Sequence, residues 1–260
     1  MFLNIFLSLI LLLSHPLVNA AEKIVTVTTL KHYAPFCMTE DDYQTNQIIP
    51  IGSDAVGFKG YSWDILRESF HQMGYTIHLS IVPWQRAINY LEKGKADILF
   101  PTGRNSEREQ RYDFSSEFIN QANFVVYLAA HNPLEWQGLH SLAGLTIGVK
   151  KGFNYGDKWR AANNIKKHDV LTILQGFKML GRGRLHGFLG YEQNWDYILK
   201  QENWQSHYKK LPKFDFSQEY LAALKSNPKG KEILNAFDTG KKHLITSGRL
   251  QQIEQKWFGE

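Results

Sequence analysis

The feature that most constrains the fold is a regular alternation of strands and helices in the first 115 residues. Alternating apolar and β-branched residues predict one strand over 24–30 and another over 75–82. Between them, apolar residues spaced by three or four predict a helix over 61–73. A second helix begins at Trp84, and a strand over 96–100 follows it. This β-α-β-α-β order predicts an α/β fold with a mainly parallel sheet covered by helices.

A second alternation later in the chain predicts a second α/β lobe. The strand predicted over 123–130 is long enough to cross between two bodies. Strands over 145–149 and 170–174 and a helix over 191–200 then repeat the pattern. A strand over 220–224 returns the chain, and two closing helices follow it.

The segment 84–115 carries the first indication of a ligand site. Pro101 is expected to end the buried strand over 96–100, and a polar loop with three arginines follows it. Ligand sites of open α/β sheets form at the C-terminal ends of the strands. Arg104 or Arg108 in this loop is therefore expected to meet an anionic ligand group.

Three other segments are predicted to be loops. Pro35 forbids a helix after the first strand, so Tyr33 sits at the sheet edge, either as core filler or as a stacking wall for a ligand. The loop over 150–156 lacks the phosphate-loop pattern, but its amides could hold an anion where a helix begins at Asn154. The long polar segment over 38–58 is expected to be a functional or mobile loop.

The N-terminal sequence predicts export. An apolar run over 2–13 is followed by a break at Pro16 and by small residues that end at Ala20. This pattern predicts a signal peptide over 1–20 and a periplasmic location, with an uncleaved anchor or a buried helix as the alternative. Cys37 is the only cysteine, so no intramolecular disulfide is expected, and its thiol is either packed or reactive.

Charge is distributed unevenly along the chain. Residues 1–140 carry 10 Lys and Arg and 14 Asp and Glu, a net charge of −4, whereas 20 and 11 give residues 141–260 a net charge of +9. The lysines of the basic part occur as separated pairs without a nucleic-acid motif, so we interpret them as a solvated surface and expect no nucleic-acid partner. The ten histidines show no metal-ligand spacing, and neither a metal nor a cofactor is expected.

A series of short motifs runs along residues 24–259. They are Tyr33-Ala34-Pro35-Phe36, Gly60-Tyr61-Ser62-Trp63-Asp64-Ile65, Pro83-Trp84, Gly94-Lys95-Ala96-Asp97-Ile98, Glu107-Arg108, Asp113-Phe114-Ser115, 145–152, Gly183-Arg184 and Trp257-Phe258-Gly259. In this order and spacing they resemble the family 3 extracellular solute-binding proteins, the polar amino-acid receptors of bacterial ABC importers. The Pro-Trp-x-Arg-Ala pattern of 83–87 resembles a divergent subgroup of that family.

This resemblance implies a two-lobed periplasmic-binding-protein fold of the Venus-flytrap type, with two crossing segments. Residues 21–121 plus 217–260 would form lobe 1, and residues 122–216 would form lobe 2. Ligand would bind in the cleft between the lobes, and hinge closure would bury it. The implied function is that of a monomer that captures a small polar, carboxylate-bearing ligand, an amino acid or a related compound, for the membrane permease of an ABC importer.

The resemblance also implies which residues contact the ligand. Tyr33 would flank the ligand side chain, and Arg108 would make a forked contact with its α-carboxylate. The loop amides of Phe153 and Asn154 would complete the carboxylate site. Trp84 is either part of the cleft wall or a core residue at a helix start. The predicted ligand-binding residues are Tyr33, Trp84, Thr102, Arg108, Phe153, Asn154, Tyr191 and Glu192.

Several positions depart from the family pattern. Pro101 has no backbone N–H where the family usually offers one, and Gly103 lacks the usual hydroxyl. Tyr191 stands where the family has the Asp that pairs the α-ammonium, with Glu192 next to it. A buried ammonium without a carboxylate is costly, so either Glu192 substitutes or the ligand is not an ordinary α-amino acid. Arg104 is either an extra cation that favours a more anionic ligand or a solvent-facing side chain.

Two other functions fit the resemblance. A ligand-sensing partner of a membrane receptor would use the same cleft. A dehydratase-like enzyme on this fold would need a general acid within reach of the leaving group, for which Glu192 or His186 could be proposed, although neither sits in a motif that requires it. We therefore expect a binding protein that is not an enzyme.

Overall fold

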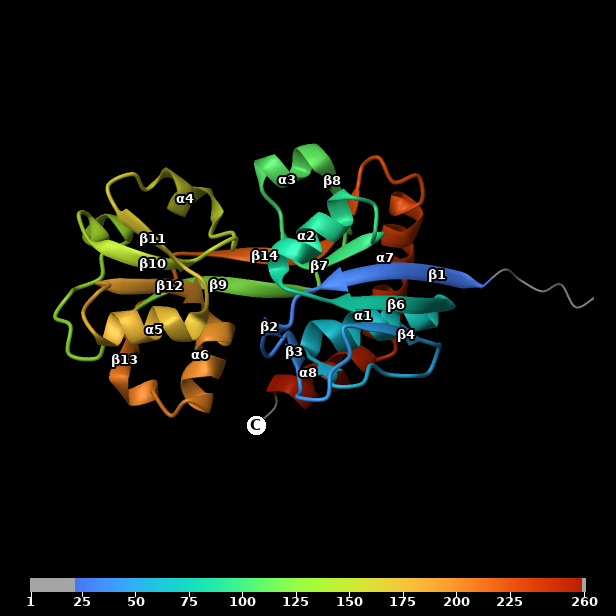
Figure 1. Cartoon of the computed structure of the whole chain (residues 1–260), viewed down its shortest axis with the longest axis horizontal. Helices are drawn as coiled ribbons and strands as arrows, with labels where there is room; N and C mark the ends of the chain where they lie inside the picture. Colours follow the sequence, from blue (N-terminus) through green and yellow to red (C-terminus); the bar gives the residue numbers. More distant parts are fainter. Residues whose placement is uncertain (1–21, 259–260) are drawn as a thin grey trace, which may run out of the picture.

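The computed structural model describes residues 22–258, so the predicted signal peptide over 1–20 lies outside the described residues. Two bodies of mixed strands and helices are joined by two long neighbouring strands (Figure 1). The α/β class and the two crossing segments predicted from the sequence are confirmed. None of the helices in the described range has both the length and the apolar character required to cross a bilayer.

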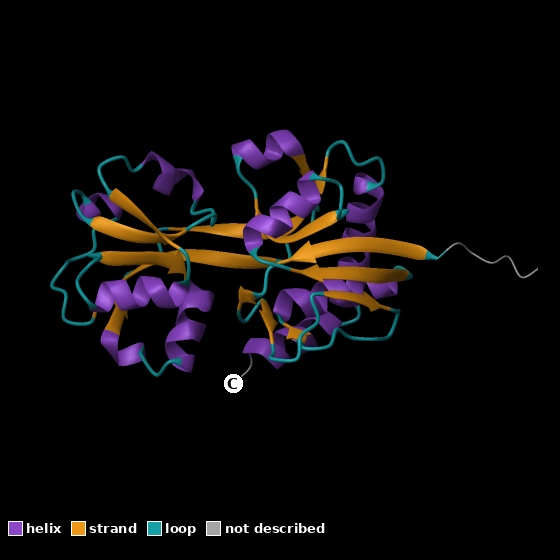
Figure 2. Ribbon diagram, in the orientation of Figure 1, coloured by secondary structure: helices purple, strands orange, loops and turns teal. Residues whose placement is uncertain are grey.

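One large sheet runs through both bodies (Figure 2). Across the sheet the strands are β11 (Lys166–Val170), β10 (Thr146–Lys150), β12 (Gly187–Tyr191), β9 (Asn120–Ala129), β14 (Asp215–Leu224), β7 (Ile98–Gly103), β1 (Lys23–Thr29), β6 (Tyr75–Ile81) and β4 (Asn46–Ile49). β13 (Tyr208–Lys210) pairs with β9, β8 (Tyr112–Phe114) pairs with β14, and a small separate sheet holds β2 (His32–Tyr33), β3 (Cys37–Thr39) and β5 (Phe58–Lys59). β1 pairs in parallel with β6 and β7, and β10 pairs in parallel with β11 and β12.

Helices cover the sheet in both bodies (Figure 1). Lobe 1 is formed by β1–β8 with α1 (Tyr61–Gln72), α2 (Trp84–Glu92), α3 (Ser106–Arg111), α7 (Gly230–Thr246) and α8 (Arg249–Phe258). Lobe 2 is formed by β10–β13 with α4 (Gly156–Ala161), α5 (Ile173–Gly181), α6 (Glu192–Gln201) and the 3-10 turns Leu139–Leu142 and Gln205–His207. Trp63, Leu66 and Phe70 on α1 are completely buried, so this helix packs as its apolar spacing predicts.

The connection between the lobes consists of β9 and β14. The two strands pair antiparallel from Asp215 opposite Phe124 to Glu219 opposite Asn120. The remainder of β9 pairs with β12 and β13 of lobe 2, and the remainder of β14 pairs with β7 and β8 of lobe 1. Any movement of one lobe relative to the other therefore has to bend this strand pair.

The prediction that Pro101 ends its strand is wrong. β7 continues through Pro101 to Gly103. The pairing between β7 and β14 shifts register between Tyr220 and Ala222, next to the proline. An irregular position of this kind does not require the N–H that proline lacks, so the strand tolerates it.

Three other local predictions differ from the structure. The polar loop after β7 contains α3, whose first turn is capped because Oδ1 of Asn105 accepts a hydrogen bond from the N–H of Arg108. The segment over 38–58 contains β4, which pairs with the edge of β6. The strand predicted over 170–174 lies earlier, at β11, and Thr172 caps the start of α5. β11 is mostly exposed, so it lacks the apolar alternation that marks a strand.

Candidate ligand-binding site

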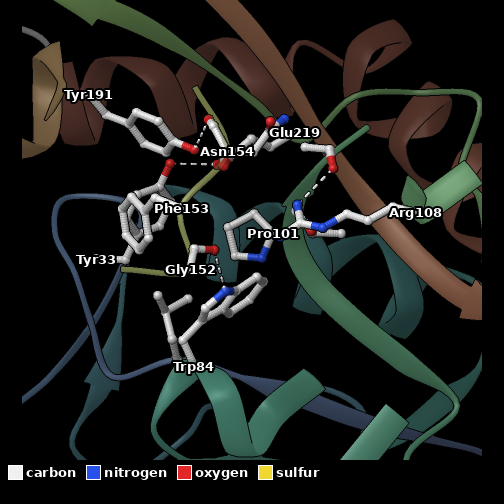
Figure 3. A pocket seen from close by; sticks show the side chains of 12 residues that line it. Tyr33, Trp84, Pro101, Arg108, Gly152, Phe153, Asn154, Tyr191 and Glu219 are labelled. Carbon is white, nitrogen blue, oxygen red and sulfur yellow. Dashed lines mark hydrogen bonds between the residues drawn. The ribbon is translucent and has the colours of Figure 1, made fainter. Parts of the chain in front are cut away.

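A cavity lies between the lobes at the C-terminal ends of β1, β7, β10 and β12 (Figure 3). Its volume is about 20 Å³, close to the space that one water molecule requires. Of the eight predicted ligand-binding residues, all except Glu192 line it. The lining residues are Leu30, Tyr33, Trp84, Pro101, Thr102, Gly103, Arg108, Gly152, Phe153, Asn154, Tyr191 and Glu219.

Arg108 extends from α3 to the cavity. Its Nη1 atom donates to Oγ1 of Thr102 at 2.8 Å and to the carbonyl oxygen of Gly103 at 2.9 Å. No carboxylate among residues 22–258 lies within ion-pair distance of this guanidinium. The side chain is thus oriented by neutral oxygens and keeps donors that a carboxylate can accept from.

Three aromatic rings form one wall of the cavity, opposite Arg108 in Figure 3. The ring centroids of Tyr33 and Phe153 are 5.9 Å apart, and those of Phe153 and Tyr191 are 5.0 Å apart. Tyr33 belongs to lobe 1 and the other two rings belong to lobe 2, so this wall crosses the cleft. The hydroxyl of Tyr191 donates to the carbonyl oxygen of Asn154 at 2.7 Å. Burial raises the pKa of Tyr33 and of Tyr191 well above the usual value, so both hydroxyls stay protonated and act as donors.

Glu219 lines the cavity and was not predicted from the sequence. It lies on β14 with only 4% of its surface exposed. Its Oε2 atom accepts hydrogen bonds from the hydroxyl of Tyr33 at 2.6 Å and from Nδ2 of Asn120 at 2.7 Å. Burial raises the pKa of the carboxyl to about 7, while these two hydrogen bonds and the charge of Arg108 act in the opposite direction. The available signal was an acidic residue directly before the apolar run over 220–224.

Hydrogen bonds across the cleft hold the lobes together around the cavity. Nε1 of Trp84 on lobe 1 donates to the carbonyl oxygen of Gly152 on lobe 2 at 3.1 Å. Nδ2 of Asn154 on lobe 2 donates to the carbonyl oxygen of Arg104 on lobe 1 at 3.2 Å. The lobes are therefore in a closed arrangement, and opening the cleft would require these contacts to break.

Glu192 and Arg104 are both engaged away from the cavity. Oε2 of Glu192 accepts from Nδ2 of Asn123 at 2.9 Å, and Oε1 lies 2.7 Å from Nζ of Lys210. Nη2 of Arg104 donates to the carbonyl oxygen of Ser115 at 2.6 Å. Arg108 is thus the arginine that the fold brings to the cavity.

The sequence over residues 25–260 matches the family of bacterial extracellular solute-binding proteins, family 3. This chain belongs to that family. The L-cystine-binding protein TcyA of Bacillus subtilis (strain 168) is 21% identical to this solute-binding protein over 237 residues, which cover 91% of this chain and 82% of TcyA.

Two solved structures share the fold of this solute-binding protein. The substrate-binding protein of an amino acid ABC transporter gives a TM-score of 0.73 at 19% identity, covering 91% of this chain and 100% of the other. A histidine kinase sensor domain with similarity to periplasmic binding proteins gives a TM-score of 0.77 at 16% identity, covering 92% and 97%. Both alignments extend over the two lobes of this solute-binding protein.

Packing across the cleft explains the glycine at position 103 of this solute-binding protein. A Cβ atom there would lie 2.7 Å from Oγ of Ser217 on β14 and 3.2 Å from Nδ2 of Asn154 on lobe 2. The hydroxyl-bearing side chain that the family resemblance implies at Gly103 would therefore require Ser217 to shift and would make a tight contact with Asn154.

Proposed function

We propose that this protein captures a small polar, carboxylate-bearing ligand, an amino acid or a related compound, in the periplasm and delivers it to the membrane permease of an ABC importer. The observation that carries the proposal is the guanidinium of Arg108, which lines a cavity between two lobes without a carboxylate partner among the described residues. In this proposal, residues 21–121 plus 217–260 move as lobe 1 and residues 122–216 move as lobe 2.

Ligand capture begins from an open arrangement, because the closed cavity has a volume of only about 20 Å³. The ligand carboxylate accepts a forked pair of hydrogen bonds from Arg108. Tyr33 and Phe153 flank the rest of the ligand from the two lobes. Contacts that form only when the cleft is closed shift the population toward the closed arrangement, which the permease recognises.

The comparisons support an amino acid or a chemically related ligand. TcyA binds L-cystine, and the solved substrate-binding protein serves an amino acid transporter. Both names describe proteins that are at most 21% identical to this chain, so they support the class of ligand. The side chain of the ligand is to be identified by the screen described below.

A second candidate function is ligand sensing for a membrane receptor, which the fold shared with a histidine kinase sensor domain favours. Cells that lack this gene distinguish the two roles. Loss of uptake of the labelled ligand supports import, whereas normal uptake with loss of the transcriptional response to the ligand supports sensing.

We propose no catalytic role. The two acids considered for a dehydratase-like reaction are both outside the cavity lining. Nδ1 of His186 accepts the N–H of Thr146 at 3.1 Å, and Glu192 is paired with Lys210. A general acid has to reach the leaving group of a bound substrate, and neither side chain is placed to do so in this arrangement.

The test is a thermal-shift screen of residues 21–260 with amino acids, dicarboxylates, polyamines and short peptides. A ligand at 100 times its Kd stabilises the native state by about 2.7 kcal/mol, which raises the Tm by roughly 5–10 °C. Arg108→Ala should abolish this shift while the unliganded protein still melts cooperatively. Arg111→Ala is the matched control, because Arg111 lies on the same helix and pairs with Glu92 outside the cavity. A wild-type shift in Arg108→Ala would contradict the proposal.

A further inference from the structure

Glu219 places a carboxylate oxygen at the cavity that the protein itself does not use. Both of its hydrogen bonds, from Tyr33 and from Asn120, go to Oε2. Within the described residues, no hydrogen bond or ion pair reaches Oε1, although the side chain is 96% buried (4% exposed) and lines the cavity (Figure 3). Oε1 is thus a carboxylate oxygen at the cavity without a donor from the described residues, and a ligand can supply one.

The position of this carboxylate is fixed by its neighbours. Asn120 stands directly opposite Glu219 in the β9–β14 pair. The hydroxyl of Ser62 on α1 donates to Oδ1 of Asn120 at 2.8 Å, which leaves Nδ2 of that amide to face Glu219. Tyr33 holds the same Oε2 atom from the other side. The acid is therefore held in one orientation before any ligand arrives, as a recognition group needs to be.

Arg108 and Glu219 line the same cavity, and yet they form no ion pair with each other. Two opposite charges held apart around one small cavity match a ligand that carries both charges. A zwitterion would satisfy the guanidinium with its carboxylate and the carboxylate with its ammonium, whereas a simple carboxylic acid would leave Glu219 without a cation.

We propose that Glu219 on β14 binds the ammonium group of a ligand whose carboxylate is held by Arg108. This inference rests on the function proposed above. The ammonium contact is then supplied by the connecting strand β14 and not by lobe 2. In lobe 2, Tyr191 donates to a carbonyl oxygen and Glu192 is paired with Lys210. A tyrosine hydroxyl that already donates to a carbonyl oxygen offers an ammonium far less than a carboxylate does.

The experiment compares matched pairs of ligands on the wild-type protein and on Glu219→Gln. The probes are the twenty standard L-amino acids and L-cystine, each tested by thermal shift at pH 8. Every amino acid that raises the Tm is then titrated calorimetrically beside its 2-hydroxy-acid analogue, which keeps the carboxylate and side chain and lacks the ammonium. Glu192→Gln is the matched control, because it makes the same chemical change at an acid outside the cavity.

The wild-type protein should bind the amino acid at least about 100-fold more tightly than its 2-hydroxy analogue, because a buried charge is left alone when its partner is removed. Glu219→Gln should lose at least about 100-fold in affinity for the amino acid and should bind the analogue as well as or better than the wild-type protein does. Glu192→Gln should behave as wild type in both titrations.

Two outcomes would overturn the inference. One is binding of the amino acid by Glu219→Gln within threefold of the wild-type affinity. The other is a Tm increase caused only by 2-hydroxy acids or dicarboxylates, which would leave carboxylate capture standing and remove the ammonium contact. If no carboxylate of any kind raises the Tm, the proposed function itself fails.

A pH titration of the wild-type protein tests the same contact without a substitution. Ionised Glu219 binds the ammonium, so the amino-acid affinity should fall by about tenfold for each pH unit below 7, the pH near which its carboxyl titrates. Affinity for an amino acid that stays constant between pH 5 and pH 8 would contradict the proposal.

Discussion

The two sides of the cavity contribute different chemistry. Lobe 1 and β14 supply its charged groups, Arg108 and Glu219. Lobe 2 supplies the rings of Phe153 and Tyr191 together with the polypeptide from Gly152 to Asn154. The charged side is held by hydrogen bonds within lobe 1 and the connecting strands, so it keeps its geometry when the cleft opens.

In the proposed function, this difference gives the two sides different roles. A ligand would meet the two charges of lobe 1 and β14 first, and lobe 2 would then cover it with apolar surface and slow its release. Substitutions on the first side should change which ligands bind, and substitutions on the second side should change how long they stay.

The largest effect is expected where closure itself is blocked. Gly103→Val adds a branched side chain where even a Cβ would lie 3.2 Å from Nδ2 of Asn154 on lobe 2. Closure should then fail, with a loss of about 100-fold in affinity by calorimetry, since overpacking costs roughly 1–3 kcal/mol. Small-angle scattering should show that the radius of gyration no longer decreases when ligand is added.

A milder pair of variants provides the control for this prediction. Gly103→Ala should lose less affinity. Adding Ser217→Ala relieves only the contact with β14, because the remaining Cβ of Ser217 lies at 3.8 Å, so a loss that persists in the double variant comes from Asn154 on lobe 2. Full closure of Gly103→Val in scattering would show that the lobes do not meet at this point.

A smaller effect is expected from Phe153, whose ring lines the cavity from lobe 2. Phe153→Ala removes a ring that packs against Tyr33 and Tyr191, and affinity should fall about tenfold, mainly through faster dissociation in stopped-flow measurements. Phe216→Ala is the control, because this ring is on β14, half-exposed and outside the cavity lining. If Phe153→Ala changed the preference between an amino acid and its 2-hydroxy analogue, charge selection would not be confined to lobe 1 and β14.

The smallest effect concerns the unliganded protein. Burial raises the pKa of Glu219 from its usual 4.5 to about 7 in the folded state, so between these values the folded state binds more protons than the unfolded state. The contribution of Glu219 to the free energy of unfolding therefore falls as pH rises from about 4.5 to 7. Above pH 7 this contribution no longer changes. The Tm of Glu219→Gln should exceed that of the wild type by a few degrees at pH 8 and by less at pH 5. An equal difference at both pH values would show that Glu219 does not titrate in this window.

Local sequence patterns predicted the helices and strands in which the spacing of apolar residues matches the buried positions. The stripe of Trp63, Leu66 and Phe70 identified α1, and the long apolar run of β9 identified a crossing strand. The position of β11 was not predicted because this strand is mostly exposed. The prediction for Pro101 was wrong because the register shift that tolerates the proline depends on the partner strand β14.

The site was predicted in part for the same reason. Arg108 and Tyr33 lie in motifs that the family resemblance covers. Glu219 contacts Tyr33 and Asn120, which are 186 and 99 residues away in the chain, so its position directly before an apolar run does not by itself mark it as a cavity residue. The pairing of β9 with β14 creates that contact, and pairing between distant strands becomes visible only in the folded chain.

The small cavity volume also decides how a complex of this protein has to be prepared. Space for about one water molecule leaves no room for a solute in molecules that are already packed in a lattice with their lobes together. Soaking crystals grown in this arrangement would leave them unchanged or would crack them as the lobes separate. The ligand has to be added in solution, before crystals form.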